Sequence, residues 1–112
     1  MITTPIDWKD VPIERVSDKV QRSVVQGDGF TLIRYVYEPG AVFSEHAHPH
    51  EQLTMVESGT LVFRVDGEEI VVGPGQMLRM APSIRHGARV SGSAQVVSLN
   101  FFVPARSEHP TA

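Results

Sequence analysis

The sequence predicts an all-β domain, and three observations support this prediction. Valine, isoleucine and threonine number 16, 6 and 6, against 5 leucines, and β-branched side chains favour strands. The 9 glycines and 8 prolines fall mostly between short apolar runs, as turn residues do. No segment shows a capped 3.6-residue periodicity typical of a helix. With 112 residues, the chain is long enough for one domain with one core.

Three regions are expected along the chain. Residues 1–19 mix prolines and charges without periodicity, so they are predicted to form an N-terminal arm packed on the body, with Trp8 and Ile13 as anchors. Residues 20–106 are predicted to form the body, a β-sandwich or barrel. Residues 107–112 are predicted to be a polar C-terminal tail.

Turn residues divide the body into short strands. The Asp66-Gly67 pair, between two apolar runs, is the strongest hairpin signal. A further run holds the histidines, and the last run is the longest apolar one. Apart from the run that holds the histidines, the predicted strands are residues 20–26, 30–38, 52–57, 60–65, 68–72, 77–81, 85–90 and 94–103.

Charge and composition argue against several classes of function. The net charge is −3 and no basic run is present, so a nucleic-acid partner is not expected. The chain has no cysteine, which excludes disulfides and thiolate metal sites. No apolar stretch has the length of a signal peptide or a membrane span. We therefore expect a cytoplasmic protein with no membrane partner.

The most informative segment holds three closely spaced histidines. His46 and His48 would project from one face of a strand, about 7 Å apart along the chain. Two imidazoles so placed can chelate one ion, and His86 and Gln52 can complete the ligand set. A solvated polar loop is the alternative, but the flanking turn and strand favour the metal site. His50 follows a proline and is expected to be a partly exposed loop residue.

These residues resemble two motifs of the cupin superfamily, over roughly residues 30–103. The first motif is carried by Gly40, His46, His48, Gln52 and Gly59. The second runs from Gly75 through Pro82 to His86. Three positions depart from the pattern: Gln52 stands where many cupins have glutamate, Ser83 replaces a turn glycine, and Val90 replaces an asparagine.

The resemblance implies a cupin double-stranded β-helix, a small barrel or jelly roll that is usually a homodimer. It also implies that His46, His48, Gln52 and His86 bind one divalent transition metal ion. Zinc, nickel, iron and manganese all suit nitrogen and oxygen ligands. Because these four ligands are neutral, the ion would act as a Lewis acid toward an anionic or oxygen-rich small molecule.

The end of the last predicted strand is similar to the small single-domain cupins that linearise unsaturated uronates in pectin and alginate breakdown. In that group an acid, a phenylalanine and an arginine occupy the positions of Asn100, Phe102 and Arg106. The resemblance implies catalytic roles for Arg106 and Asn100, and substrate binding by Arg106 and Phe102. Arg106 would pair with a substrate carboxylate, and a solvated arginine is its alternative. Phe102 would stack on a sugar ring or belong to the core.

Asn100 puts the reaction in question, because an amide cannot supply the proton that the acid would. Either metal-bound water does the acid–base work or the substrate differs. The best prediction is an isomerase or lyase of carbohydrate metabolism that opens the ring of an unsaturated sugar acid. Two alternatives remain open: another metal-dependent cupin enzyme, such as a dioxygenase or polyketide cyclase, and a non-catalytic cupin that binds or senses a small molecule.

Overall fold

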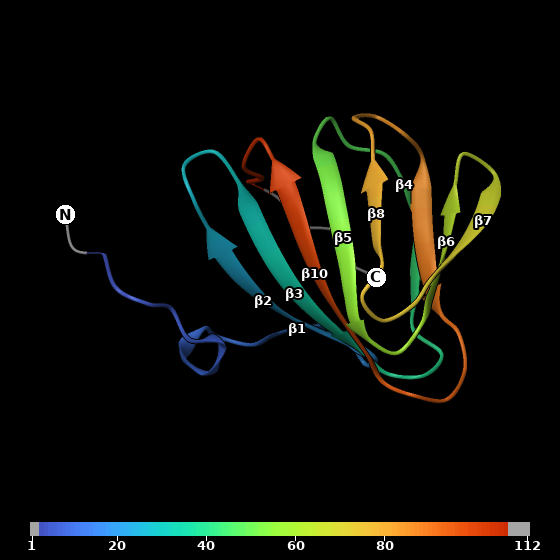
Figure 1. Cartoon of the computed structure of the whole chain (residues 1–112), viewed down its shortest axis with the longest axis horizontal. Coiled ribbons are helices and arrows are strands. Elements are labelled where there is room, and N and C mark those ends of the chain that lie inside the picture. The colour runs from blue at the N-terminus through green and yellow to red at the C-terminus, as the bar shows by residue number, and fades with distance from the viewer. Residues whose placement is uncertain (1–2, 108–112) are drawn as a thin grey trace.

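Two antiparallel sheets that face each other form the body of the molecule (Figure 1). The computed structural model describes residues 3–107. One sheet has six strands in the order β1-β2-β3-β10-β5-β8, and the other has four in the order β4-β9-β6-β7. The strands are β1 (Glu14–Ser17), β2 (Val20–Gln26), β3 (Thr31–Tyr37), β4 (Val42–His46), β5 (Glu51–Ser58), β6 (Leu61–Val65), β7 (Glu68–Val72), β8 (Met77–Met80), β9 (His86–Val90) and β10 (Val96–Val103). The all-β prediction is confirmed.

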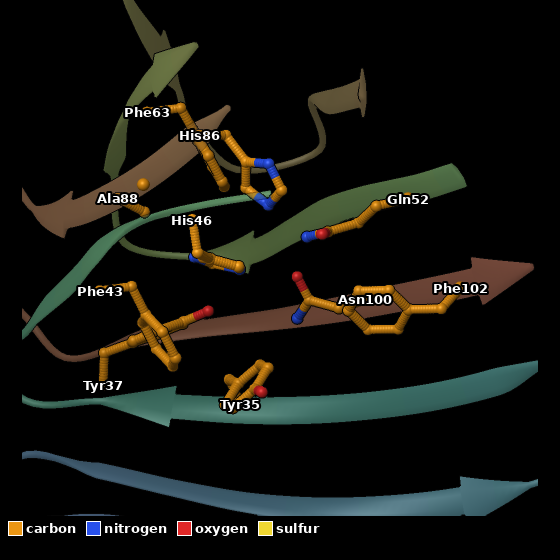
Figure 2. Close-up of a pocket in the computed structure, with 11 residues that line it drawn as sticks. Tyr35, Tyr37, Phe43, His46, Gln52, Phe63, His86, Ala88, Asn100 and Phe102 are labelled. Atoms are coloured by element: carbon orange, nitrogen blue, oxygen red, sulfur yellow. The ribbon is translucent and has the colours of Figure 1, made fainter. Parts of the chain in front are cut away.

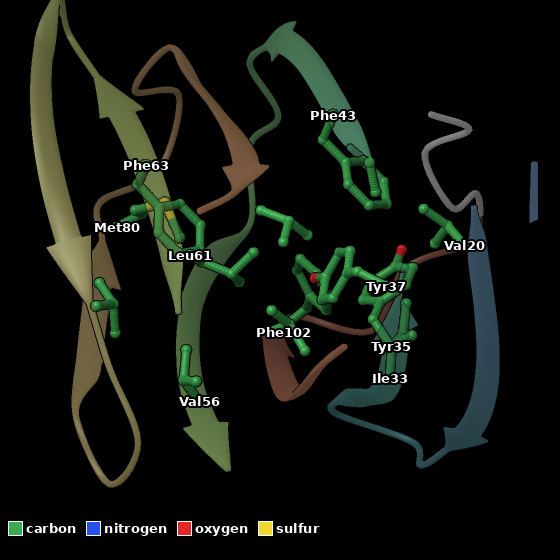
Figure 3. Close-up of a cluster of buried hydrophobic side chains, with 14 residues drawn as sticks. Val20, Ile33, Tyr35, Tyr37, Phe43, Val56, Leu61, Phe63, Met80 and Phe102 are labelled. Atoms are coloured by element: carbon green, nitrogen blue, oxygen red, sulfur yellow. The ribbon is translucent and has the colours of Figure 1, made fainter. Parts of the chain in front are cut away.

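The core lies between the two sheets, where apolar side chains from both sheets pack together (Figure 3). In β3 every second residue from Thr31 to Tyr37 is buried. In β10 the inward positions begin at Val96 and end at Phe102. The inward face of β10 carries Ser98 and Asn100 between these two apolar residues. One strand therefore contributes both to the apolar core and to a buried polar group.

Most strands occupy the segments that the sequence predicts. β2 and β7 have the predicted bounds, and the other predicted strands differ by one or two residues at an end. The β6–β7 hairpin turns at Asp66 and Gly67, both with positive φ, of 48° and 84°. That conformation is the tight type I′ turn that the Asp-Gly pair favours.

The predicted arm differs from the expectation in two ways. Glu14–Ser17 form β1, which pairs with β2 at the edge of the large sheet. Before it, the chain with its short 3-10 helix η1 (Trp8–Asp10) extends away from the sheets (Figure 1). Ile13 is 70% exposed, so the prediction that it anchors the arm by packing is wrong. Of the predicted tail, only residue 107 is within the described residues.

Strand register brings polar side chains of the two sheets to one end of the body. His46 ends β4 and is paired with His86, which begins β9. In the large sheet Gln52 is paired with Phe102, near the end of β10. The side chains predicted to bind a metal and a substrate thus come from both sheets. No helix in residues 3–107 is long and apolar enough to span a membrane.

Candidate metal centre

Three histidines form a compact group between the sheets, as the sequence predicts. One ring nitrogen from each of His46, His48 and His86 can be chosen so that all three lie within 4.8 Å of one another. The ring centroids of His46 and His86 are 4.6 Å apart, and those of His48 and His86 are 4.9 Å apart. Figure 2 shows His46 and His86 turned toward the same space as Gln52.

His48 reaches this group from a loop, which corrects the prediction that it shares a strand face with His46. β4 ends at His46, and Pro49 has no N–H with which a ladder could continue. The carbonyl of His48 instead accepts a hydrogen bond of 2.7 Å from the N–H of Ser83. Ser83 has φ of 64°, so this serine adopts the left-handed conformation for which the motif uses glycine. The turn before β9 thereby fixes the loop that carries His48.

Backbone carbonyls set the tautomer of all three imidazoles. Nδ1 of His46 lies 2.9 Å from the carbonyl oxygen of Ser44. Nδ1 of His48 and of His86 lie 3.1 and 3.0 Å from the carbonyl oxygens of His50 and Ile84. A carbonyl only accepts, so each Nδ1 carries a hydrogen, and in the neutral ring Nε2 then keeps its lone pair. This is the arrangement in which imidazole binds a metal through Nε2.

Burial keeps two of these rings uncharged at neutral pH. It lowers the pKa of His48 to about 4, and the charges of Arg106 and His86 act in the same direction. Burial also lowers the pKa of His86, with contributions from His46 and Arg106. Neutral imidazole is the form that binds metal. The Nε2 atom of His86 is buried and has no hydrogen-bond partner among the described residues, as expected for a nitrogen that would bind a metal ion.

Gln52 adds an oxygen to the group. Its Oε1 lies 3.1 Å from Nε2 of His48, yet both atoms are acceptors in the tautomer described above. A shared cation would stabilise two lone pairs this close, so the separation fits two ligands of one ion. The four residues therefore fit a divalent transition metal ion. Their nitrogen and oxygen donors do not distinguish zinc, nickel, iron and manganese.

A small cavity of about 30 Å³ lies beside this group, with room for about two water molecules. Figure 2 shows several of the side chains that surround it. Aromatic residues fill the space deeper between the sheets, where Tyr35 and Tyr37 pack edge-on against Phe43. The cavity is lined by Tyr35, Tyr37, Phe43, His46, Gln52, Phe63, His86, Gly87, Ala88, Asn100 and Phe102.

Arg106 is buried next to the histidines, so the alternative of a solvated arginine is wrong. The residue is 8% exposed, and its guanidinium carbon lies 4.8 Å from the centre of the Phe102 ring. The backbone N–H of Arg106 donates to Oγ1 of Thr31 at 2.8 Å, which holds the chain across the end of the large sheet. Phe102 is both a core residue and a cavity wall, and its ring packs against that of His48.

Asn100 lies in the cavity wall with every polar atom of its side chain hydrogen-bonded. Its Oδ1 accepts from Thr54 at 2.8 Å, and its Nδ2 donates to Ser98 at 2.9 Å and to the carbonyl of Ile33 at 3.3 Å. Thr54 and Ser98 were not predicted as site residues. The available signal was their place in the sequence, since polar residues at inward positions of β5 and β10 alternate along the chain with apolar residues at outward positions.

The carboxylates next to the histidines in the sequence form ion pairs with arginines. Glu45 forms ion pairs with Arg64 and Arg85, each at 3.5 Å. Glu51 pairs with Arg79. His50 is half-buried, as expected for a loop residue, and its ring packs against that of His48 without joining the three-histidine group. Within residues 3–107, the group thus contains three imidazole rings and no carboxylate.

Comparison with known proteins assigns the fold. Residues 33–103 match the family model described as a cupin domain. KdgF from Halomonas sp. superposes with a TM-score of 0.85 at 21% identity, over 95% of this chain and 97% of that one. An RmlC-like cupin from Shewanella frigidimarina NCIMB 400 gives a TM-score of 0.81 at 26% identity, over 88% of each chain. A predicted oxalate decarboxylase from Thermotoga maritima gives 0.82 at 15% identity, over 90% of this chain and 99% of that one. No curated protein matches the sequence.

Proposed function

The chain belongs to the cupin domain family, and from this premise we propose that it is a metal-dependent isomerase or lyase that opens the ring of an unsaturated sugar acid. Its resemblance to the small single-domain cupins that act on unsaturated uronates supports this proposal. His46, His48, His86 and Gln52 would hold the ion. A bound divalent ion would polarise an oxygen of the ligand.

The observation on which the proposal depends is the position of Arg106. A buried guanidinium beside three imidazoles favours a negatively charged ligand at this end of the body, since the histidine group includes no carboxylate from residues 3–107. Such a site favours an anion, and a guanidinium matches a carboxylate with two parallel hydrogen bonds. A sugar acid offers one carboxylate together with oxygens that a metal ion can bind.

The small cavity limits where a sugar ring could lie. A space of about 30 Å³ does not accommodate a six-membered ring, so the ring would lie at the open end beside Phe102 and Arg106. There Phe102 would exclude water from one side, and Arg106 would orient the carboxylate. Asn100 has no titratable proton and its hydrogen bonds are already made, so it would shape the site rather than transfer a proton.

Two measurements test this function. Protein purified without added ions should contain about one transition metal per chain, and His48→Ala should lose it. His50→Ala is the matched control from the same loop and should keep the metal.

The metal-loaded protein should consume unsaturated uronate faster than the spontaneous rate, as measured by the loss of the absorbance of the uronate. We expect Arg106→Lys to raise KM more than it lowers kcat, since it keeps the charge and loses the bidentate geometry.

Decay at the spontaneous rate with a fully loaded site would contradict the sugar-acid reaction. In that case a second function is favoured, namely non-catalytic binding of a small anion. The complete hydrogen bonding of Asn100 supports it, because residues 3–107 place no carboxyl group in the cavity wall for acid–base work. Ligand binding without turnover would identify this function, whereas oxygen consumption by an iron-loaded sample would identify an oxygenase.

We further propose that the protein is a homodimer that covers the outer face of the large sheet. Leu53, Met77, Phe101 and Val103 are 38–60% exposed on β5, β8 and β10. The pairing of Phe101 with Leu53 places them side by side on this face, and a cleft runs between them. A contiguous exposed apolar patch of this kind marks an interaction surface. A second copy would also give the exposed arm, with Ile6 and Ile13, a surface on which to pack.

A further inference from the structure

We infer that Thr54 and Asn100 are positioning residues that hold the carbonyl oxygen of Gln52 toward the three histidines. The inference rests on the proposed metal site and concerns how one of its ligands is oriented. An amide has two different ends, and only the oxygen can bind a cation. Some feature of the protein must therefore select which end of Gln52 faces the group.

A chain of buried hydrogen bonds runs from the histidine group into the body. Nε2 of Gln52 donates to Oγ1 of Thr54 at 2.9 Å, and this hydroxyl donates to Oδ1 of Asn100 at 2.8 Å. Nδ2 of Asn100 donates to Oγ of Ser98, which is 3.0 Å from the hydroxyl of Tyr37. Thr54 and Ser98 are completely buried, so water does not compete for these contacts.

Asn100 fixes the donor-to-acceptor direction of this series of hydrogen bonds. The Nδ2 atom of Asn100 also donates to the backbone carbonyl of Ile33 at 3.3 Å. A backbone carbonyl accepts and never donates, so the Asn100 amide must point its nitrogen toward Ile33 and its oxygen toward Thr54. The Thr54 hydroxyl then uses its hydrogen on Asn100 and can only accept from Gln52. The nitrogen of Gln52 must therefore face Thr54, and its oxygen must face the histidines.

This orientation is unfavourable unless a cation lies in the group. Oε1 of Gln52 is 3.1 Å from Nε2 of His48, and the bond from Nδ1 of His48 to the carbonyl of His50 leaves Nε2 without a hydrogen. Two lone pairs so close repel each other. A rotated amide would turn the repulsion into a hydrogen bond and would remove a metal ligand. The Thr54–Asn100 contact opposes that rotation, so the ligand is already oriented before the ion binds.

The inference is tested by measuring the metal affinity of the purified, metal-free protein in competition with a chromophoric chelator. Thr54→Val keeps the shape of the side chain and removes the hydroxyl, so the amide of Gln52 is free to rotate. We expect affinity to fall about 10-fold or more, within the range seen when groups that orient metal ligands are removed. Thr54→Ser should restore it. The absorption spectrum of the cobalt-loaded protein should change with Thr54→Val and return with Thr54→Ser.

Two further variants separate orientation from a loss of packing. In a Gln52→Glu background both carboxylate oxygens can bind the ion, so adding Thr54→Val should cost little affinity. Ser98→Ala removes an equally buried hydroxyl beyond the Ile33 anchor, and it should leave affinity unchanged. Thermal unfolding of each metal-free variant reports whether it is folded.

The outcomes distinguish the inference from the proposed function. Equal losses from Thr54→Val in the unmodified protein and in the Gln52→Glu background would overturn the inference, as would a loss of the same size from Ser98→Ala. Unchanged affinity in Thr54→Val would also overturn it, while leaving the metal site in place. If the unmodified protein binds no transition metal, the proposed function itself fails.

Discussion

Backbone carbonyls orient the three imidazoles of this site, and burial keeps His48 and His86 neutral. The carbonyls of Ser44, His50 and Ile84 each lie two residues from the histidine that they contact. The tautomers are therefore a local property of the strand ends and of one loop. Gln52 differs, because its orientation depends on a chain of side chains that ends at a carbonyl on β3. Among the candidate metal ligands, the imidazoles are therefore oriented by nearby residues in the sequence, and the Gln52 amide is oriented by distant ones.

Buried tyrosines make the protein sensitive to alkaline pH. Burial raises the pKa of Tyr37 far above its ordinary value, and the contact with Ser98 only partly offsets this. In the unfolded chain the phenol ionises near pH 10, so above that pH the unfolded state loses a proton that the folded state keeps. The free energy of unfolding should fall as the pH rises from about 10 to about 11. In Tyr37→Phe the decline should be shallower by about 1.4 kcal/mol per pH unit.

Urea denaturation of the metal-free proteins at several pH values would measure this difference. Below about pH 10 the Tyr37 phenol keeps its proton in both the folded and the unfolded state. The free energy of unfolding should therefore change with pH by the same slope in the unmodified protein and in Tyr37→Phe. Parallel slopes at higher pH would show that Tyr37 does not titrate differently in the two states, contrary to the prediction.

The sequence was sufficient to identify the candidate metal ligands but not the groups that orient them. His46, His86 and Gln52 follow from motif spacing, and the group of three histidines is present in the structure. Threonine is common in strands whatever its role, and the hydrogen bonds of Thr54 and Ser98 join residues up to 61 positions apart in the chain. The solvated alternative for Arg106 was open for the same reason, because its burial depends on the ends of β3 and β10 coming together.

At the scale of single elements, the β6–β7 hairpin depends on one glycine. Gly67 has φ of 84°, a conformation in which a Cβ crowds the following carbonyl. Gly67→Ala should lower the free energy of unfolding by about 1 kcal/mol. Gly29 is the matched control, since its φ is not positive in this range and an added Cβ would meet no atom within 4 Å.

Chemical denaturation of the two variants measures the free energies of unfolding that test this prediction. Gly29→Ala should leave stability unchanged or raise it slightly, because alanine reduces the freedom of the unfolded chain. A Gly67→Ala variant as stable as Gly29→Ala would mean that the hairpin can change its turn type without cost.

Strand prediction succeeded where turn residues bound a run rich in β-branched residues, and it failed where such a run was absent. β2 and β7 were placed to the residue, with turn residues on both sides. β1 reads Glu-Arg-Val-Ser, with one apolar residue, so nothing in its own sequence predicts a strand, and pairing with β2 provides it. The misplacement of His48 has a similar origin. The chain leaves the ladder before Pro49, and the contact with Ser83 that holds the loop comes from 35 positions further along the chain.

At the scale of the whole molecule, the two sheets have different surroundings. Their inner faces share the core and the candidate site, while the outer face of the large sheet leaves a row of apolar side chains in solvent. Phe30 stacks on Phe101 at 5.2 Å between ring centres, which extends the apolar patch toward the β2–β3 turn. Burial of such a patch stabilises association, and homodimer interfaces are rich in apolar surface.

This patch should determine the oligomeric state. Met77 is 60% exposed on β8, so Met77→Glu costs a lone chain little stability, but it would place a desolvated charge inside a dimer interface. Light scattering coupled to gel filtration should give a dimer for the unmodified protein and a monomer for Met77→Glu. Val71→Glu, at a residue 65% exposed on the small sheet, should remain dimeric. A monomeric unmodified protein, or equal dissociation by both substitutions, would contradict the assignment of this face.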